Sequence, residues 1–111
     1  MPKLIRTSDS DTFLVEVRGE QWRFPYTFLP CFVAMFSVLR KYAWLDDCVV
    51  RVCNRLTSSS EPIAAYALFY EAILEDDYIT MDQYYMITTT YLKISMRYNS
   101  GISFMIRCPA S

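Results

Sequence analysis

The side chains that could carry chemistry in this chain of 111 residues are four cysteines and a group of carboxylates, because the sequence contains no histidine. Without an imidazole there is no Ser-His-Asp or Cys-His nucleophile pair and no mixed Cys/His zinc site. The only two glycines, Gly19 and Gly101, are isolated, so no phosphate-cradling loop is present. We therefore expect a protein that is not an enzyme and that holds no cofactor and no metal.

The carboxylates that come closest to a site are Glu71, Glu75, Asp76, Asp77 and Asp82. Carboxylates can bind a divalent cation or transfer protons. Three of these are consecutive, however, and they lack the alternating ligand spacing and the glycine of a calcium loop. We interpret this run as the solvated end of a helix.

The four cysteines, Cys31, Cys48, Cys53 and Cys108, show no C-x-x-C spacing, and each lies in an apolar stretch. This pattern predicts small buried thiols in a reducing compartment rather than a disulfide framework. No signal-peptide pattern opens the chain, and its longest apolar run, residues 24–39, is shorter than the roughly 20 residues of a bilayer span. We expect an intracellular protein, in the cytoplasm or nucleus, without a membrane span.

The charges are distributed unevenly, although the formal net charge is only −1. Residues 1–56 carry eight bases and six acids, residues 57–90 carry six acids and no base, and residues 91–111 carry three bases and no acid. An acidic middle and a basic end can neutralise each other within one fold or between two copies of the chain. The small net charge gives no general attraction to nucleic acid or to acidic membranes.

Hydrophobic periodicity and turn residues predict the elements that position these side chains. Residues 12–18 and 21–26 are β-prone and flank Gly19, which predicts a β-hairpin. Three helices are expected next, over residues 27–41, 44–56 and 61–76. The first should be capped by Thr27 and should be central to the fold. Residues 80–83 match a capping box, so a short helical turn is expected there.

The end of the chain is strongly β-prone. Residues 86–98 and 102–108 are separated by Asn99-Ser100-Gly101, which predicts a second hairpin. The resulting order is ββαααββ in a single domain, residues 1–111. We expect an α+β fold in which an antiparallel four-stranded sheet is covered on one face by helices. Edge strands of so small a sheet could also pair across the axis of a homodimer.

Aromatic residues make up 16% of the chain, a large share for a domain with little interior. Tyr, Trp, Phe and Met are enriched at protein interfaces, because they bury a large area at modest cost in conformational entropy. We expect part of this set to contact another protein or a second copy of the chain. The alternative is a tightly packed aromatic core. The predicted interface residues are Trp22, Tyr26, Phe69, Tyr70, Tyr84, Tyr85 and Met86.

A second predicted site is basic. Lys93, Arg97 and Arg107 would lie on the second hairpin, interleaved with Tyr91, Tyr98 and Phe104, and such a ribbon could stack bases and contact phosphates. Three basic residues make few phosphate contacts. Nucleic-acid binding is therefore the alternative function, and nucleic acid is the less favoured partner.

The first 25 residues resemble a known family. Lys3-Leu4-Ile5, Ser8-Asp9 and Thr12-Phe13-Leu14-Val15 are similar to the opening strands of the elongin C and BTB adaptor family. The sequence departs from that family in having no evident strand between its first two helices and in its closing hairpin. The resemblance implies a surface that binds other proteins.

These observations predict a compact α+β domain whose function is protein–protein interaction, as an accessory or regulatory factor that forms a homodimer. Small domains without catalytic motifs are typical of such factors, including viral proteins that bind host proteins.

Overall fold

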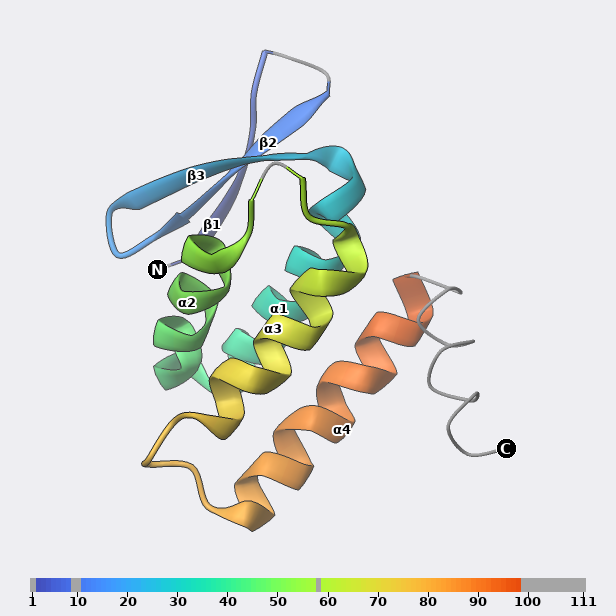
Figure 1. The fold of residues 1–111 in the computed structure, drawn as a ribbon. Coiled ribbons are helices and arrows are strands. Elements are labelled where there is room, and N and C mark those ends of the chain that lie inside the picture. The colour runs from blue at the N-terminus through green and yellow to red at the C-terminus, as the bar shows by residue number, and fades with distance from the viewer. Residues whose placement is uncertain (1, 9–10, 58, 99–111) are drawn as a thin grey trace.

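Three β-strands and four α-helices make up the part of the chain that the computed structural model describes, residues 2–8, 11–57 and 59–98 (Figure 1). The strands come first, as β1 (Lys3–Arg6), β2 (Thr12–Val17) and β3 (Glu20–Pro25). The helices follow as α1 (Leu29–Lys41), α2 (Asp46–Arg55), α3 (Pro62–Leu74) and α4 (Met81–Tyr98). Two single turns of 3-10 helix, η1 (Tyr26–Phe28) and η2 (Ala43–Leu45), lead into α1 and α2.

The sheet has the order β1-β2-β3 with antiparallel neighbours, so β1 and β3 are its edges. The predicted first hairpin is confirmed, because β2 and β3 are joined through Arg18 and Gly19, with Val17 paired to Glu20. Both turn residues have a positive φ, 55° at Arg18 and 81° at Gly19. This is the two-residue turn whose twist matches that of the flanking strands, and glycine adopts it without steric cost.

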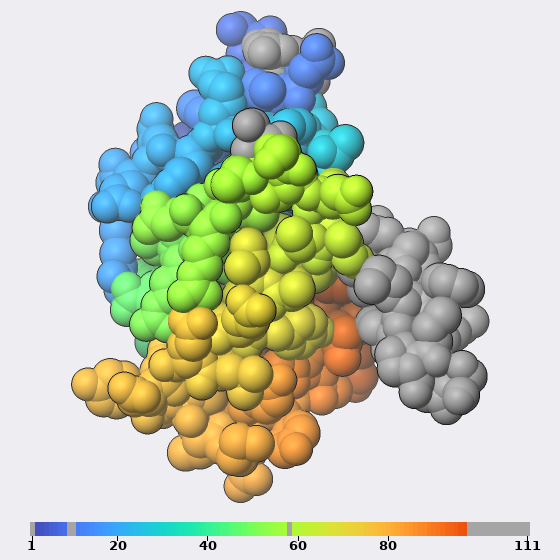
Figure 2. Space-filling model, viewed as in Figure 1, coloured from blue at the N-terminus to red at the C-terminus, as the bar shows by residue number. Residues whose placement is uncertain are grey.

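One face of the sheet is buried against the helices. Phe13, Val15 and Val17 alternate along β2 and are at most 1% exposed, as expected for a strand with one buried face. The ring of Phe32 in α1 lies 5.8 Å from that of Phe13 and 4.9 Å from that of Phe24, between centroids. These contacts place α1 across the sheet and confirm that it is central, while α2 and α3 pack side by side (Figure 2).

The predicted four-stranded sheet is wrong, because residues 86–98 belong to α4 and the sheet has three strands. Residues 102–108, the other predicted strand, lie outside the described residues. The side chains of Ile87, Tyr91 and Ser95 recur every four residues and are fully buried, which is the spacing of one helix face. Packing of this face outweighs the local β-propensity of the tyrosines and threonines around it.

The start of α4 confirms the predicted capping box, although the helix is much longer than the short turn that was expected. The Thr80 hydroxyl accepts the Gln83 backbone N–H at 3.1 Å, and the Gln83 side-chain oxygen accepts the Thr80 N–H at 3.0 Å. The predicted cap of α1 is wrong. That helix begins at Leu29 without a side-chain cap, and Pro30 lies in its first turn, where the missing N–H is tolerated.

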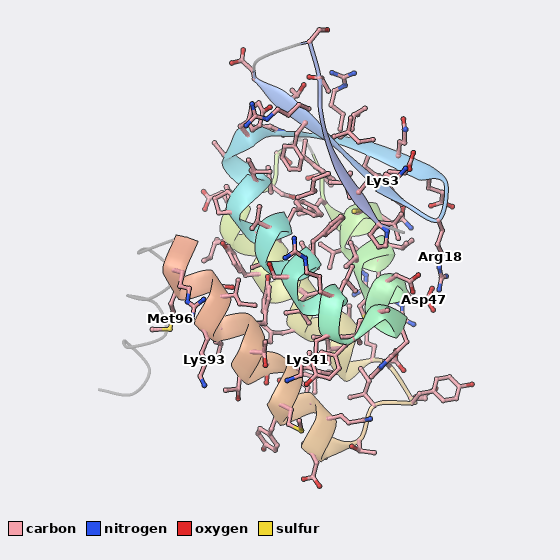
Figure 3. All side chains as sticks on the ribbon, turned by 180° about the vertical axis from the view of Figure 1, so that it is seen from behind. Lys3, Arg18, Lys41, Asp47, Lys93 and Met96 are labelled. Carbon is pink, nitrogen blue, oxygen red and sulfur yellow. The ribbon has the colours of Figure 1, made fainter. Side chains whose placement is uncertain are left out.

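An exposed ion pair ties the hairpin turn to α2. The Arg18 guanidinium donates to both carboxylate oxygens of Asp46, at 3.0 and 2.9 Å, and also to Asp47 (Figure 3). The hydrogen bond to Asp46 is the main cause that raises the pKa of Arg18. The two acids also lie in the first turn of α2, where the helix dipole favours negative charge.

We expect Thr80→Ala to lower the free energy of unfolding by about 1 kcal/mol, because it removes the acceptor of the Gln83 N–H. Thr80→Ser keeps the hydroxyl and should retain most of the stability. Chemical denaturation followed by circular dichroism would measure both variants. Equal losses in the two would show that the capping box does not stabilise α4.

Candidate protein-interaction surface

The predicted interface residues of α3 lie in or against the core. Phe69 is fully buried, with its ring centroid 4.6 Å from that of Tyr91. Tyr70 is partly buried, and its ring meets Tyr91 edge-on at 5.4 Å. Burial raises the pKa of the Tyr70 hydroxyl, which has no hydrogen-bond partner among the described residues. Phe69 is thus a core residue and is not available to a partner.

Trp22 and Tyr26 are held by contacts within the chain. The Trp22 indole N–H donates to the side-chain oxygen of Asn54 in α2 at 3.2 Å. The Tyr26 ring lies 5.8 Å from that of Phe13. Both side chains are partly buried against the core, so they help to attach the sheet to the rest of the fold.

The remaining three predicted residues lie together in the first turns of α4. Tyr84 is partly buried against the core, whereas Tyr85 and Met86 are exposed. The rings of Tyr84 and Tyr85 meet edge-on, 5.6 Å apart. Tyr84 thus links the exposed ring of Tyr85 to the core.

Further exposed apolar side chains gather where α3 is connected to α4, at the opposite end of the molecule from the sheet (Figures 1 and 2). Trp44 of η2 is 45% exposed and Tyr78 of the connection 90%, and the two residues line one shallow hollow. Leu74, Met81 and Tyr85 are exposed by 59% to 62%. We call this set the α3–α4 tip; it consists of Trp44, Leu74, Tyr78, Met81 and Tyr85.

The backbone of the α3–α4 tip is held by local hydrogen bonds. The Asp76 carboxylate accepts the Tyr78 N–H at 2.9 Å, and the Thr80 and Gln83 capping box fixes the start of α4. Ile79, next to Tyr78, packs against the core. An ordered backbone carries these exposed rings, which lowers the entropy lost when a partner binds.

The α3–α4 tip lies in the acidic part of the chain. Glu75 caps the end of α3, and its carboxylate accepts two hydrogen bonds from Arg55 at 3.0 and 2.8 Å. These hydrogen bonds from Arg55 are the main cause that lowers the pKa of Glu75. The pair therefore stabilises the fold at neutral pH, and this contribution is lost as the pH falls through the lowered pKa. Exposed pairs of this kind stabilise a fold only weakly.

Two exposed acids of the same region are not neutralised. Asp77 and Asp82 take part in none of the ion pairs of the described residues. Within those residues no group of Cys, Asp and Glu is arranged to hold a metal ion. The negative charge of Asp77 and Asp82 is therefore available to a positively charged partner.

The basic residues predicted to contact nucleic acid do not lie on a hairpin. Lys93 (Figure 3) and Arg97 are exposed and one turn apart on α4, and Arg107 lies outside the described residues. Tyr91, one of the aromatic residues expected to stack bases, is fully buried and shares a hydrogen bond with the Cys31 thiol at 3.4 Å. The predicted stacking ribbon is therefore not formed by residues 86–98.

The cysteines of the described residues are buried free thiols, as predicted. Cys31, Cys48 and Cys53 are at most 2% exposed. Burial is the main cause that raises the pKa of each thiol to about 12. At neutral pH these thiols are protonated, so none of the three is activated as a nucleophile.

No protein-family model, curated protein or solved structure matches this chain. The adaptor-family resemblance therefore rests on the first 25 residues alone. Between α1 and α2 the chain passes through η2 without forming a strand, which maintains one of the departures from that family. No helix among the residues placed by the structure is long and apolar enough to cross a membrane.

We expect Cys31, Cys48 and Cys53 to be unreactive towards Ellman's reagent in the native protein at mildly alkaline pH, because each is buried and its pKa is about 12. A Cys108→Ser variant removes the fourth thiol and should release no chromophore until denaturant is added. Rapid reaction of one thiol in the native variant would instead reveal an accessible nucleophile.

Proposed function

We propose that this chain is a non-catalytic protein-interaction domain and that the α3–α4 tip is its contact surface. One observation carries the proposal: five large apolar side chains, 45% to 90% exposed, lie at one end of the molecule. Single exposed apolar residues are ordinary, but exposed apolar groups that gather in one place mark interaction sites.

The α3–α4 tip has the composition of a binding site. Trp and Tyr supply much of the binding energy at protein interfaces. Trp44 and Tyr78 line a hollow of about 410 Å³ together with Asp47, Asp76 and Gln83. An apolar side chain of a partner would contact the two rings there, and the three polar residues could bind its backbone or its charged neighbours.

The charge around the α3–α4 tip indicates the kind of partner. Residues 57–90 contain no Lys or Arg, and Asp77 and Asp82 are exposed without an ion-pair partner in the described chain. A segment with Lys or Arg beside an apolar side chain would complement both properties, and an Arg could also stack on Tyr78. The proposed partner is a basic, apolar segment of another protein, since phosphates of a nucleic acid would meet these carboxylates.

We expect a photo-cross-linking amino acid at position 78 to capture a partner from nuclease-treated lysate of cells that express the chain, and the same group at position 96 to capture none. Met96 is the matched control, because it is also an exposed apolar residue but lies near the other end of α4 (Figure 3). The cross-linked peptide, identified by mass spectrometry, should contain Lys or Arg beside apolar residues.

The charge of the α3–α4 tip should control this capture. Asp77→Lys combined with Asp82→Lys is expected to reduce capture at position 78 about tenfold, equivalent to about 1.4 kcal/mol, because the two lysines repel a basic partner. Both residues are exposed, so the core is untouched. Equal capture at positions 78 and 96, or equal capture at position 78 with and without the two Asp→Lys changes, would contradict the proposal. Cross-links between copies of the chain alone would assign the tip to a homodimer instead.

A further inference from the structure

A groove lies on another side of the molecule, between the edge strand β1 and α1. It has a volume of about 450 Å³ and is lined mainly by apolar side chains, among them Leu4, Val33 and Phe36, with Arg40 as a charged lining residue. Figure 3 shows this side of the molecule, with Lys3 at the sheet and Lys41 at the end of α1. Leu4 and Phe36 bring strand and helix together in one apolar surface, which we call the β1–α1 groove.

The backbone of β1 can accept another strand. One side of β1 is paired with β2, and its other side is unpaired within the described residues. Such an edge can bind an extended peptide through main-chain hydrogen bonds. Leu4 is paired with the buried Val15, so it faces the helices and the groove. In a strand added to β1, every second side chain would therefore enter the groove.

The surroundings of the β1–α1 groove are basic. Lys3 and Arg6 are the two ends of β1, and Arg40 and Lys41 end α1. Residues 2–8 and 26–45 contain no Asp or Glu. None of the four cations takes part in an ion pair of the described residues. Unneutralised positive charge beside an apolar groove fits a ligand that is both acidic and apolar.

These charges argue against a second copy of the chain as the occupant. A second β1 strand carries Lys3 and Arg6 and no acid, so two paired β1 strands would bring four cations to one edge and supply none of the carboxylates that this charge favours. The acidic run of the chain, residues 75–77, could not supply the added strand from a second copy either, because it lies in a turn in which the Asp76 carboxylate accepts the Tyr78 N–H.

We propose that the β1–α1 groove binds an extended segment of a partner protein, as a strand added to β1, in which an acidic and an aliphatic residue lie two positions apart. Both side chains then face the groove: the aliphatic one contacts Leu4 and Phe36, and the carboxylate lies on the side of Arg6 and Arg40. The groove selects the opposite charge from the α3–α4 tip, so each surface can be tested without the other.

Selection from a phage library of random short peptides tests this proposal. We expect enriched sequences in which Glu or Asp lies two positions from Val, Ile or Leu. A synthetic peptide of the enriched sequence should bind about tenfold more weakly to the Arg6→Glu/Arg40→Glu variant, because the new carboxylates repel the acidic peptide. Both positions are exposed, so we expect the variant to fold. Arg23→Glu reverses an exposed charge on the opposite edge strand β3 and is the matched control. It should leave peptide binding unchanged.

Strand addition itself has a spectroscopic signature. In nuclear Overhauser spectra, the backbone protons of the bound peptide should contact those of Leu4 and Ile5. The proposal is overturned if no sequence is enriched, if the enriched sequences lack acidic residues, or if the Arg6→Glu/Arg40→Glu variant binds normally. It is also overturned if binding is lost in Tyr78→Ser rather than in that variant, or if the peptide competes with dimerisation of the chain, which would make a second copy the occupant.

Discussion

The arrangement of the helices depends on the burial of Tyr91 in the middle of α4. Its ring lies 4.6 to 5.8 Å from three aromatic rings of α3, which belong to Tyr66, Phe69 and Tyr70. Its hydroxyl and the Cys31 thiol of α1 share a hydrogen bond. One side chain thus joins three helices. Because α4 is fixed at its centre, its first turns are held at the end of the molecule, where Met81 and Tyr85 meet solvent.

The elements defined by neighbouring residues could be predicted from the sequence, and the element defined by distant contacts could not. The turn at Gly19 and the capping box at Thr80 each need only a few adjacent residues. The helical state of α4 depends instead on α1 and α3, which bury its inner face. The hydroxyls of Thr88 and Thr90 donate to carbonyl oxygens four residues earlier, at 2.8 and 2.9 Å. This satisfies β-prone side chains within the helix itself.

Only part of the candidate surface could be predicted from the sequence, because the exposure of a side chain depends on packing between distant elements. Tyr85 and Met86 are exposed, as an interface requires, but α3 is apolar on most of its sides, so its period does not show that Phe69 faces inward. Trp44 is the first residue of the helix that was expected over residues 44–56. It lies in the 3-10 turn η2 instead, whose different period rotates it towards solvent. Tyr78 follows an acidic run that indicated only a solvated connection.

The ion pair between Arg18 and Asp46 joins the most local part of the sheet, a two-residue turn, to a helix 28 positions away in sequence. Neighbouring strands of a hairpin can separate on their own when their turn is tethered only by backbone hydrogen bonds. Here opening of the turn must also break the contacts of Arg18 with α2, which adds a small amount to the free energy of opening because the ion pair is exposed. The edge strand β1 is therefore attached to the helices through β2, whose buried side chains Phe13, Val15 and Val17 pack in the core, while the ion pair is a second, exposed attachment of the same sheet.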